Sequence, residues 1–147
     1  MRHLIIAVAA GAAALSAAPL SGAAFAAKPE LPLGPAPASG TGLPSGQCFR
    51  SSDIRSHKFA DGRTLLVNVR NKDVYRVTMR GACMNGAMDS DPLITRIPPG
   101  SNIICKPIDM DVSVAKGGFG FSTPCFVDSI VKVSPEEVAA LPRKLKP

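Results

Sequence analysis

The sequence of 147 residues predicts a mainly β fold, a small antiparallel β barrel or sandwich with a short C-terminal helix and two disulfides. Three observations predict it. Apolar and polar side chains alternate through residues 64–80, which is the period of a strand. Four cysteines follow an amino terminus typical of export, and an oxidising compartment favours their pairing. Near the end of the chain, Ser134 can cap a helix, Pro135 suits its first position and Glu137 completes a capping box.

Residues 1–26 have the pattern of a secretory signal peptide. A short basic start precedes an alanine-rich apolar run, and small residues flank Phe25 at the positions that a signal peptidase reads. The alternative is a transmembrane anchor, which needs about 20 apolar residues, but glycine, serine and proline interrupt this run. We expect cleavage near Ala26, a periplasmic or secreted product, and no transmembrane segment after processing. The formal charge of +6 then falls to +5, because Arg2 is lost.

The mature chain divides into three parts by composition. Residues 27–46 are rich in proline and glycine and show no periodicity, so we expect a flexible lead that buries no core. Residues 47–142 form the β domain, which is long enough for one hydrophobic core. Residues 143–147 are a basic tail.

The clearest element is a hairpin in residues 64–80. Its two runs place apolar side chains on one face and mostly polar side chains on the other. A three-residue loop, residues 71–73, keeps the two apolar faces together, with Asn71 or Asp73 in a left-handed conformation. This loop predicts the pairs Val69–Tyr75, Val67–Val77 and Leu65–Met79.

Shorter strands are predicted around the hairpin. A strand over residues 54–60 precedes the turn signal Asp61-Gly62 and places His57 opposite Val67 and Phe59 opposite Leu65. Residues 125–133 are apolar on both faces, as in a central strand. Further short strands are expected over residues 93–97, 102–105 and 110–115.

The cysteines Cys48, Cys83, Cys105 and Cys125 permit three pairings in two disulfides. We favour Cys83–Cys105, which would close the loop after the hairpin, and Cys48–Cys125, which would join the first strand to the last. Their spacing contains no C-x-x-C, so it does not support a thioredoxin-like redox site or a zinc knuckle.

Candidates for catalysis and metal binding are few. His57 is the one histidine outside the predicted leader, and a hydrolase would combine it with Asp53 or Ser56. No G-x-S-x-G nucleophile motif accompanies it. We therefore predict no catalytic residue, no metal and no cofactor, and interpret His57 as structural.

Two acidic pairs and the methionines have structural interpretations as well. Asp89 with Asp91, and Asp109 with Asp111, are too few oxygens for a calcium loop, so we expect solvated acids. Four methionines, Met79, Met84, Met88 and Met110, lack the clustered spacing of a copper site and are expected to pack in the core or in loops.

A glycine-rich loop over residues 116–121 carries Phe119 and Phe121. It lacks the G-K-[ST] ending of a phosphate-binding loop. If the two rings face solvent, this loop tip is the leading candidate for a contact surface.

The arrangement of motifs resembles a bacterial family of small secreted four-cysteine domains with no assigned function. The resemblance covers residues 47–141 and is carried by C-F at Cys48, G-x-C ending at Cys83, I-C ending at Cys105, P-C-F-V around Cys125, and the S-P-E-E helix start. It implies no catalytic residues.

These observations favour a non-enzymatic binding or envelope-associated module. A charge of +5 favours an anionic envelope component, such as lipid head groups or acidic glycans, and another periplasmic protein is a further possible partner. The alternatives are a secreted inhibitor of a hydrolase, presenting a loop such as residues 117–124, and a hydrolase that uses His57. Nucleic acid is disfavoured, because basic and aromatic residues do not cluster.

Overall fold

The structure, a computed structural model, describes residues 31–96, 102–118 and 122–147. The predicted signal peptide, and Phe119 and Phe121 with it, lie outside these ranges. The strands are β1 (Phe49–Arg50), β2 (Ile54–Phe59), β3 (Thr64–Val69), β4 (Asp73–Met79), β5 (Leu93–Arg96), β6 (Ile103–Ile104), β7 (Asp111–Val114), β8 (Thr123–Cys125) and β9 (Val127–Lys132). The helix α1 spans Pro135–Ala140, and short 3-10 helices are η1 (Ser51–Asp53), η2 (Pro107–Asp109), η3 (Lys116–Gly118) and η4 (Arg143–Leu145).

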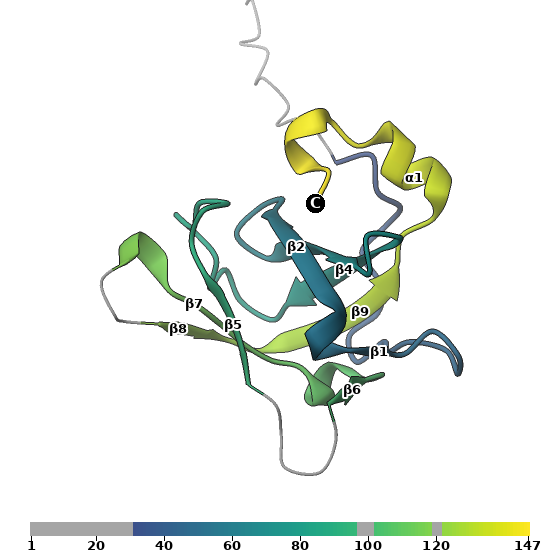
Figure 1. Ribbon diagram of the computed structural model, residues 1–147, viewed down its shortest axis with the longest axis horizontal. Helices are drawn as coiled ribbons and strands as arrows, with labels where there is room; N and C mark the ends of the chain where they lie inside the picture. The colour runs from purple at the N-terminus through teal and green to yellow at the C-terminus, as the bar shows by residue number, and fades with distance from the viewer. Residues whose placement is uncertain (1–30, 97–101, 119–121) are drawn as a thin grey trace, which may run out of the picture.

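The strands form antiparallel sheets in a sandwich-like arrangement (Figure 1). One sheet has the order β2-β3-β4-β9, a second has the order β5-β7-β8, and β1 pairs with β6. The prediction of a mainly β fold with a short C-terminal helix and two disulfides is confirmed. Of the two predicted architectures the sandwich applies, because the described strands do not close into a barrel.

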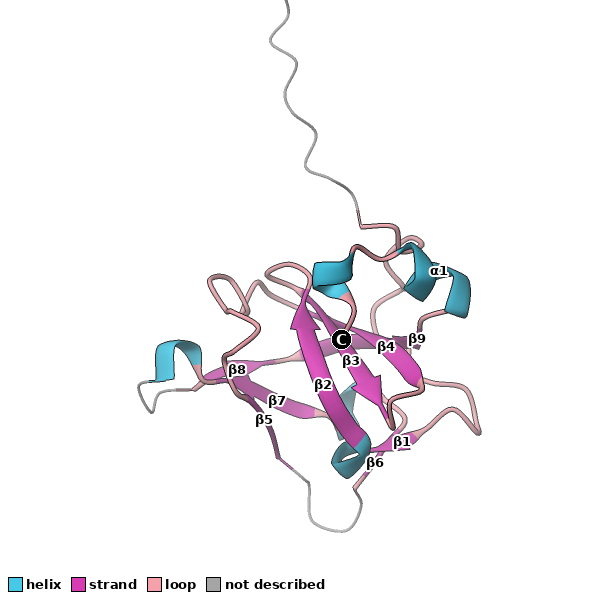
Figure 2. Ribbon diagram, turned by 45° about the horizontal axis from the view of Figure 1, so that its top comes forward, coloured by secondary structure: helices cyan, strands magenta, loops and turns pink. Residues whose placement is uncertain are grey.

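Both faces of the sheet β2-β3-β4-β9 contribute to a hydrophobic core. On one face Leu65, Val67 and Val77 join the main core, which extends to the β5-β7-β8 sheet. On the other face Leu66 and Val74 join a second core with α1 and the C-terminal residues. Figure 2 shows α1 and η4 on the side of this sheet away from β5, β7 and β8. The alternation was therefore predicted correctly, but the face expected to be mostly polar also carries a core.

The hairpin register differs from the predicted one by two residues. Leu65 pairs with Val77 and Val67 with Tyr75. The loop has three residues, as predicted, but it is Arg70-Asn71-Lys72, one residue earlier than expected. Arg70 and Asn71 both have positive φ, and an asparagine tolerates that conformation. A shift of two preserves the buried faces, so the hydrophobic pattern could not distinguish the two registers.

Residues 125–133 are not one central strand, and that prediction is wrong. The chain leaves the β5-β7-β8 sheet at Cys125 and enters the four-stranded sheet at Val127, paired to β7 before the change and to β4 after it. Phe126 lies between the two strands, and its carbonyl accepts a hydrogen bond from the Arg80 backbone N–H at 2.9 Å. The change of sheet turns this one side chain outward, where it is 73% exposed.

Both predicted disulfide pairings are wrong, because the structure joins Cys48 to Cys105 and Cys83 to Cys125. Antiparallel pairing of β1 with β6 places Phe49 opposite Ile104, which brings the cysteines just outside this pair to a Cα–Cα distance of 4.7 Å. The second bond connects the loop after β4 to the end of β8, with a Cα–Cα distance of 5.6 Å.

The described part of the proline- and glycine-rich lead packs on the domain. Leu43 belongs to the main core, so the prediction that this segment buries no core is wrong. Ile130 N–H donates to the Thr41 carbonyl at 2.9 Å and Gly40 N–H donates to the Asp128 carbonyl at 2.8 Å. These bonds cover the edge of β9 that does not face β4.

The helix begins as predicted. The Ser134 hydroxyl accepts a hydrogen bond from Glu137 N–H, and the Glu137 carboxylate accepts one from Ser134 N–H. The same carboxylate accepts from Gly34 N–H, and these backbone donors, Gly34 first and then Ser134, lower the pKa of Glu137. Among the described residues, α1 and the 3-10 helices are all too short to cross a membrane.

Candidate functional site

The position of His57 does not favour the hydrolase hypothesis. His57 pairs with Val67, as predicted, and its Nε2 lies 3.2 Å from the backbone carbonyl of Asp91. Burial lowers the pKa of the half-buried imidazole. Asp53 forms an ion pair with Arg70 at 2.7 Å. Asp53, one of the two proposed partners, is therefore held by Arg70, and the described hydrogen bonds of His57 do not include one to a carboxylate that would orient it as a base.

The acidic pair Asp89 and Asp91 holds nearby backbone and side-chain groups. Asp91 is 4% exposed, and its carboxylate accepts hydrogen bonds from the backbone N–H groups of Met88 and Gly117. Asp89 binds the Lys58 ammonium at 3.0 Å. The prediction of solvated acids is therefore wrong for Asp91. Within the described ranges, no group of three or more His, Cys, Asp or Glu side chains could hold a metal ion.

Three of the four methionines are core residues, in agreement with the packing interpretation. Met79, Met84 and Met110 are buried in the main core, whereas Met88 is exposed. Flexible thioethers fill irregular space in such a core, which contains few aromatic side chains.

A cleft of about 600 Å³ lies between η2 and the β8–β9 junction. We call it the η2 cleft. Its lining is mostly apolar, and it includes Pro107, Ile108 and Met110 on one side and Pro124, Phe126 and Val127 on the other.

Two side chains at the η2 cleft are unusually exposed for their type. Ile108 is 84% exposed and Phe126 is 73% exposed, the highest values among the large apolar side chains of the described residues. Single exposed apolar residues are ordinary on a protein surface, but two at one cleft mark a candidate binding site.

Each of these two exposed residues follows a disulfide cysteine. Phe126 comes directly after Cys125, and Ile108 comes three residues after Cys105. The η2 turn is further held by the Asp109 carboxylate, which accepts the backbone N–H groups of Cys105 at 3.1 Å and Lys106 at 2.8 Å. Each side of the cleft therefore lies close in sequence to a disulfide.

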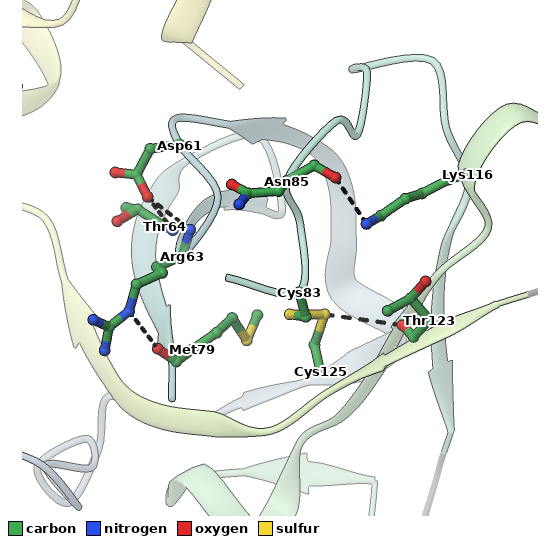
Figure 3. The surroundings of a disulfide bond; sticks show 9 residues. All are labelled: Asp61, Arg63, Thr64, Met79, Cys83, Asn85, Lys116, Thr123 and Cys125. Atoms are coloured by element: carbon green, nitrogen blue, oxygen red, sulfur yellow. Dashed lines mark hydrogen bonds between the residues drawn. A yellow bond between two sulfur atoms is a disulfide. The ribbon is translucent and has the colours of Figure 1, made fainter. Parts of the chain in front are cut away.

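Figure 3 shows the hydrogen bonds around the Cys83–Cys125 disulfide, including those that hold the loop that carries Cys83. The Lys116 ammonium donates to the Asn85 carbonyl at 2.8 Å. On the neighbouring turn, Arg63 Nε donates to the Met79 carbonyl at 3.3 Å. These contacts hold the end of β4 and the loop after it, and Cys83 in that loop is bonded to Cys125.

Charged groups at the η2 cleft are mainly cationic. Arg80 and Lys106 line it, and the Arg80 side chain is largely exposed, with Asp128 at 3.8 Å. Lys106 forms no ion pair with any described residue. The one carboxylate of the lining, Asp111, lies opposite Arg96 across β5 and β7.

Sequence reasoning did not identify this cleft. It placed Phe126 within a buried strand, and its own candidate residues, Phe119 and Phe121, lie outside the described ranges. Pro124 gave no signal against that strand, because it precedes the predicted range of residues 125–133 and proline is accepted at the start of a strand. Nothing in the sequence indicates that residues 108 and 126 lie at one cleft.

The chain was compared with known proteins. A family model described as a family of unknown function, DUF6491, matches residues 1–146. No curated protein and no solved structure matches the chain.

Proposed function

We propose a function for this chain, which belongs to DUF6491, a family of unknown function. It is a non-enzymatic binding module that holds an apolar group in the η2 cleft. We further propose that it acts after export, in the periplasm or at the cell envelope. The observation that supports binding most directly is that the two most exposed large apolar side chains of the described residues, Ile108 and Phe126, line the same cleft.

Physical chemistry favours a binding role for such a site. Removing apolar surface from water is favourable by about 25 cal/mol per Å², so a ligand that covers these two large exposed side chains would gain binding free energy. Attachment to disulfide-bonded segments limits the ordering that binding requires, which increases affinity. The volume of about 600 Å³ lies within the usual range for sites of small ligands.

A neutral, environment-sensitive fluorophore tests the proposal. The chain contains no tryptophan and one tyrosine, so the emission of N-phenyl-1-naphthylamine can be followed with little protein background. We expect saturable binding by the exported protein. Phe126→Ser and Ile108→Ser should each weaken it about tenfold, which is about 1.4 kcal/mol, as for a residue central to a binding site.

Ile94→Ser is the matched control, because Ile94 is an exposed isoleucine on β5 that does not line the η2 cleft. It should leave probe binding unchanged. Absence of saturable binding to the native protein, or equal loss in all three variants, would contradict the proposal.

Export has a separate test. Mass spectrometry of the protein recovered from periplasmic extracts of cells expressing the full chain should show a new amino terminus after Ala26 and no free thiol. Recovery of an unprocessed, reduced chain from the cytosol alone would contradict an exported role.

A further inference from the structure

We infer that the ligand of the η2 cleft is a single-chain amphiphile with an anionic head group, whose chain lies on the apolar lining while its head meets Arg80 and Lys106. This inference rests on the proposed function and adds the chemical class of the ligand. The argument uses the charges, the size and the backbone of the cleft.

The hydrogen-bonding groups that remain available at the cleft are mainly donors. Lys106 has three ammonium donors and forms no ion pair with a described residue. Arg80 has five donors, of which only Nε approaches a carboxylate, that of Asp128, at 3.8 Å. This distance is too long for a hydrogen bond, so the guanidinium can turn its fork to an anion.

The nearby carboxylates are partly occupied. Asp109 accepts two backbone N–H groups, and Asp128 accepts the hydroxyl of Ser39. Asp111 lies opposite the cationic Arg96. A head group that accepts hydrogen bonds therefore fits these donors better than a head group that donates them.

The size of the cleft favours a small molecule over a folded protein. Eleven described residues line it, whereas one side of a stable protein–protein interface usually has about 20–30 residues. A volume of about 600 Å³ suits a ligand with one acyl chain.

The backbone at the cleft disfavours an extended peptide. β8 is an edge strand, but Pro124 at its centre has no N–H to donate to an added strand. The carbonyl of Phe126 already accepts from Arg80 N–H. Strand addition would therefore gain few main-chain hydrogen bonds here.

Two amphiphiles with the same chain and opposite charge test the inference. Dodecanoate and dodecyltrimethylammonium, each below its critical micelle concentration, compete with the neutral fluorophore for the exported protein. We expect dodecanoate to displace the fluorophore at a concentration at least tenfold lower than the cation does. Added salt should reduce this preference, because it screens charges at the surface.

Charge variants assign the preference to the two cations. Arg80→Gln and Lys106→Gln should each lower the ratio of dodecanoate affinity to fluorophore affinity by about threefold to tenfold. Lys72→Gln, which removes an exposed cation in the loop between β3 and β4, should leave the ratio unchanged.

The outcomes separate this inference from the proposed function. Fluorophore binding with no preference for the anion, or an unchanged ratio in both cleft variants, would overturn the inference and leave the binding function standing. Absence of fluorophore binding would overturn the function itself. Flotation of the protein with phosphatidylglycerol vesicles, without competition by monomeric dodecanoate, would also overturn the inference, because the cleft would then contact a membrane surface.

Discussion

Removal of the Cys48–Cys105 disulfide should destabilise the fold by about 4 kcal/mol. The bond joins residues 57 positions apart, and the entropy of closing a loop of that length in the unfolded chain corresponds to about 4 kcal/mol at 25 °C. The variant Cys48→Ser/Cys105→Ser removes both sulfur atoms and leaves no unpaired partner. Urea unfolding followed by circular dichroism measures the loss, and measured values for single disulfides reach about 2–5 kcal/mol.

The same variant tests the pairing. If Cys48 is bound to Cys105, the double variant retains Cys83–Cys125 and shows no alkylation without reductant. The matched variant Cys83→Ser/Cys125→Ser should likewise show none, and its separation of 42 residues gives a similar loss of about 4 kcal/mol. Two reactive thiols in either variant, or a change below about 1 kcal/mol in both, would refute the reasoning from strand pairing.

The remaining predictions concern backbone approach, pH and helix capping. Gly42→Ala should lower the free energy of unfolding by about 1–3 kcal/mol in urea, because the added Cβ would lie 2.7 Å from the Cys105 carbonyl oxygen. In the control Gly81→Ala the added Cβ meets nothing within 4 Å, so the free energy of unfolding should change by less than about 0.5 kcal/mol. Equal effects of the two substitutions would contradict this reasoning. Burial lowers the folded-state pKa of His57 below its unfolded value of 6.5, so the unfolded state binds more protons between the two values. Stability should therefore fall as the pH falls from 6.5 through the folded pKa. A pH series of urea titrations should show that this pH dependence is weaker in His57→Gln. The same pH dependence in both proteins would exclude His57 as its source. Ser134→Ala removes the acceptor at the start of α1 and should cost about 1 kcal/mol in the same assay, and an unchanged midpoint would show that the cap contributes nothing.

Much of the fold could be predicted because its signals are local. Alternation assigned the faces of β3 and β4, and the pairing of His57 with Val67 followed from the turn after β2. The capping box of α1 lies within four consecutive residues. In contrast, the register of β3 on β4 depends on which residues of the loop accept positive φ, and Arg70 has no sequence signal for that conformation.

The candidate site could not be predicted from local signals. A run of apolar residues around Phe126 is compatible with one buried strand or with two strands joined at an exposed residue. The β4 and β7 strands decide between them, since each pairs with a different part of the run. The sequence around Ile108 does not indicate a binding site either, because that interpretation depends on the cleft that Ile108 lines together with Phe126.

The sequence by itself determined that this chain would form antiparallel strands with a capped C-terminal helix, because alternation and capping depend on residues close together in the chain. It also determined that four cysteines would make two disulfides, since their number and predicted compartment suffice for that. Only the tertiary structure decided which cysteines pair, and that Ile108 and Phe126 line one cleft. The first depends on the pairing of β1 with β6, and the second on a chain that passes from one sheet to another. Both bring together residues that are far apart in the sequence, and local sequence patterns do not specify such contacts.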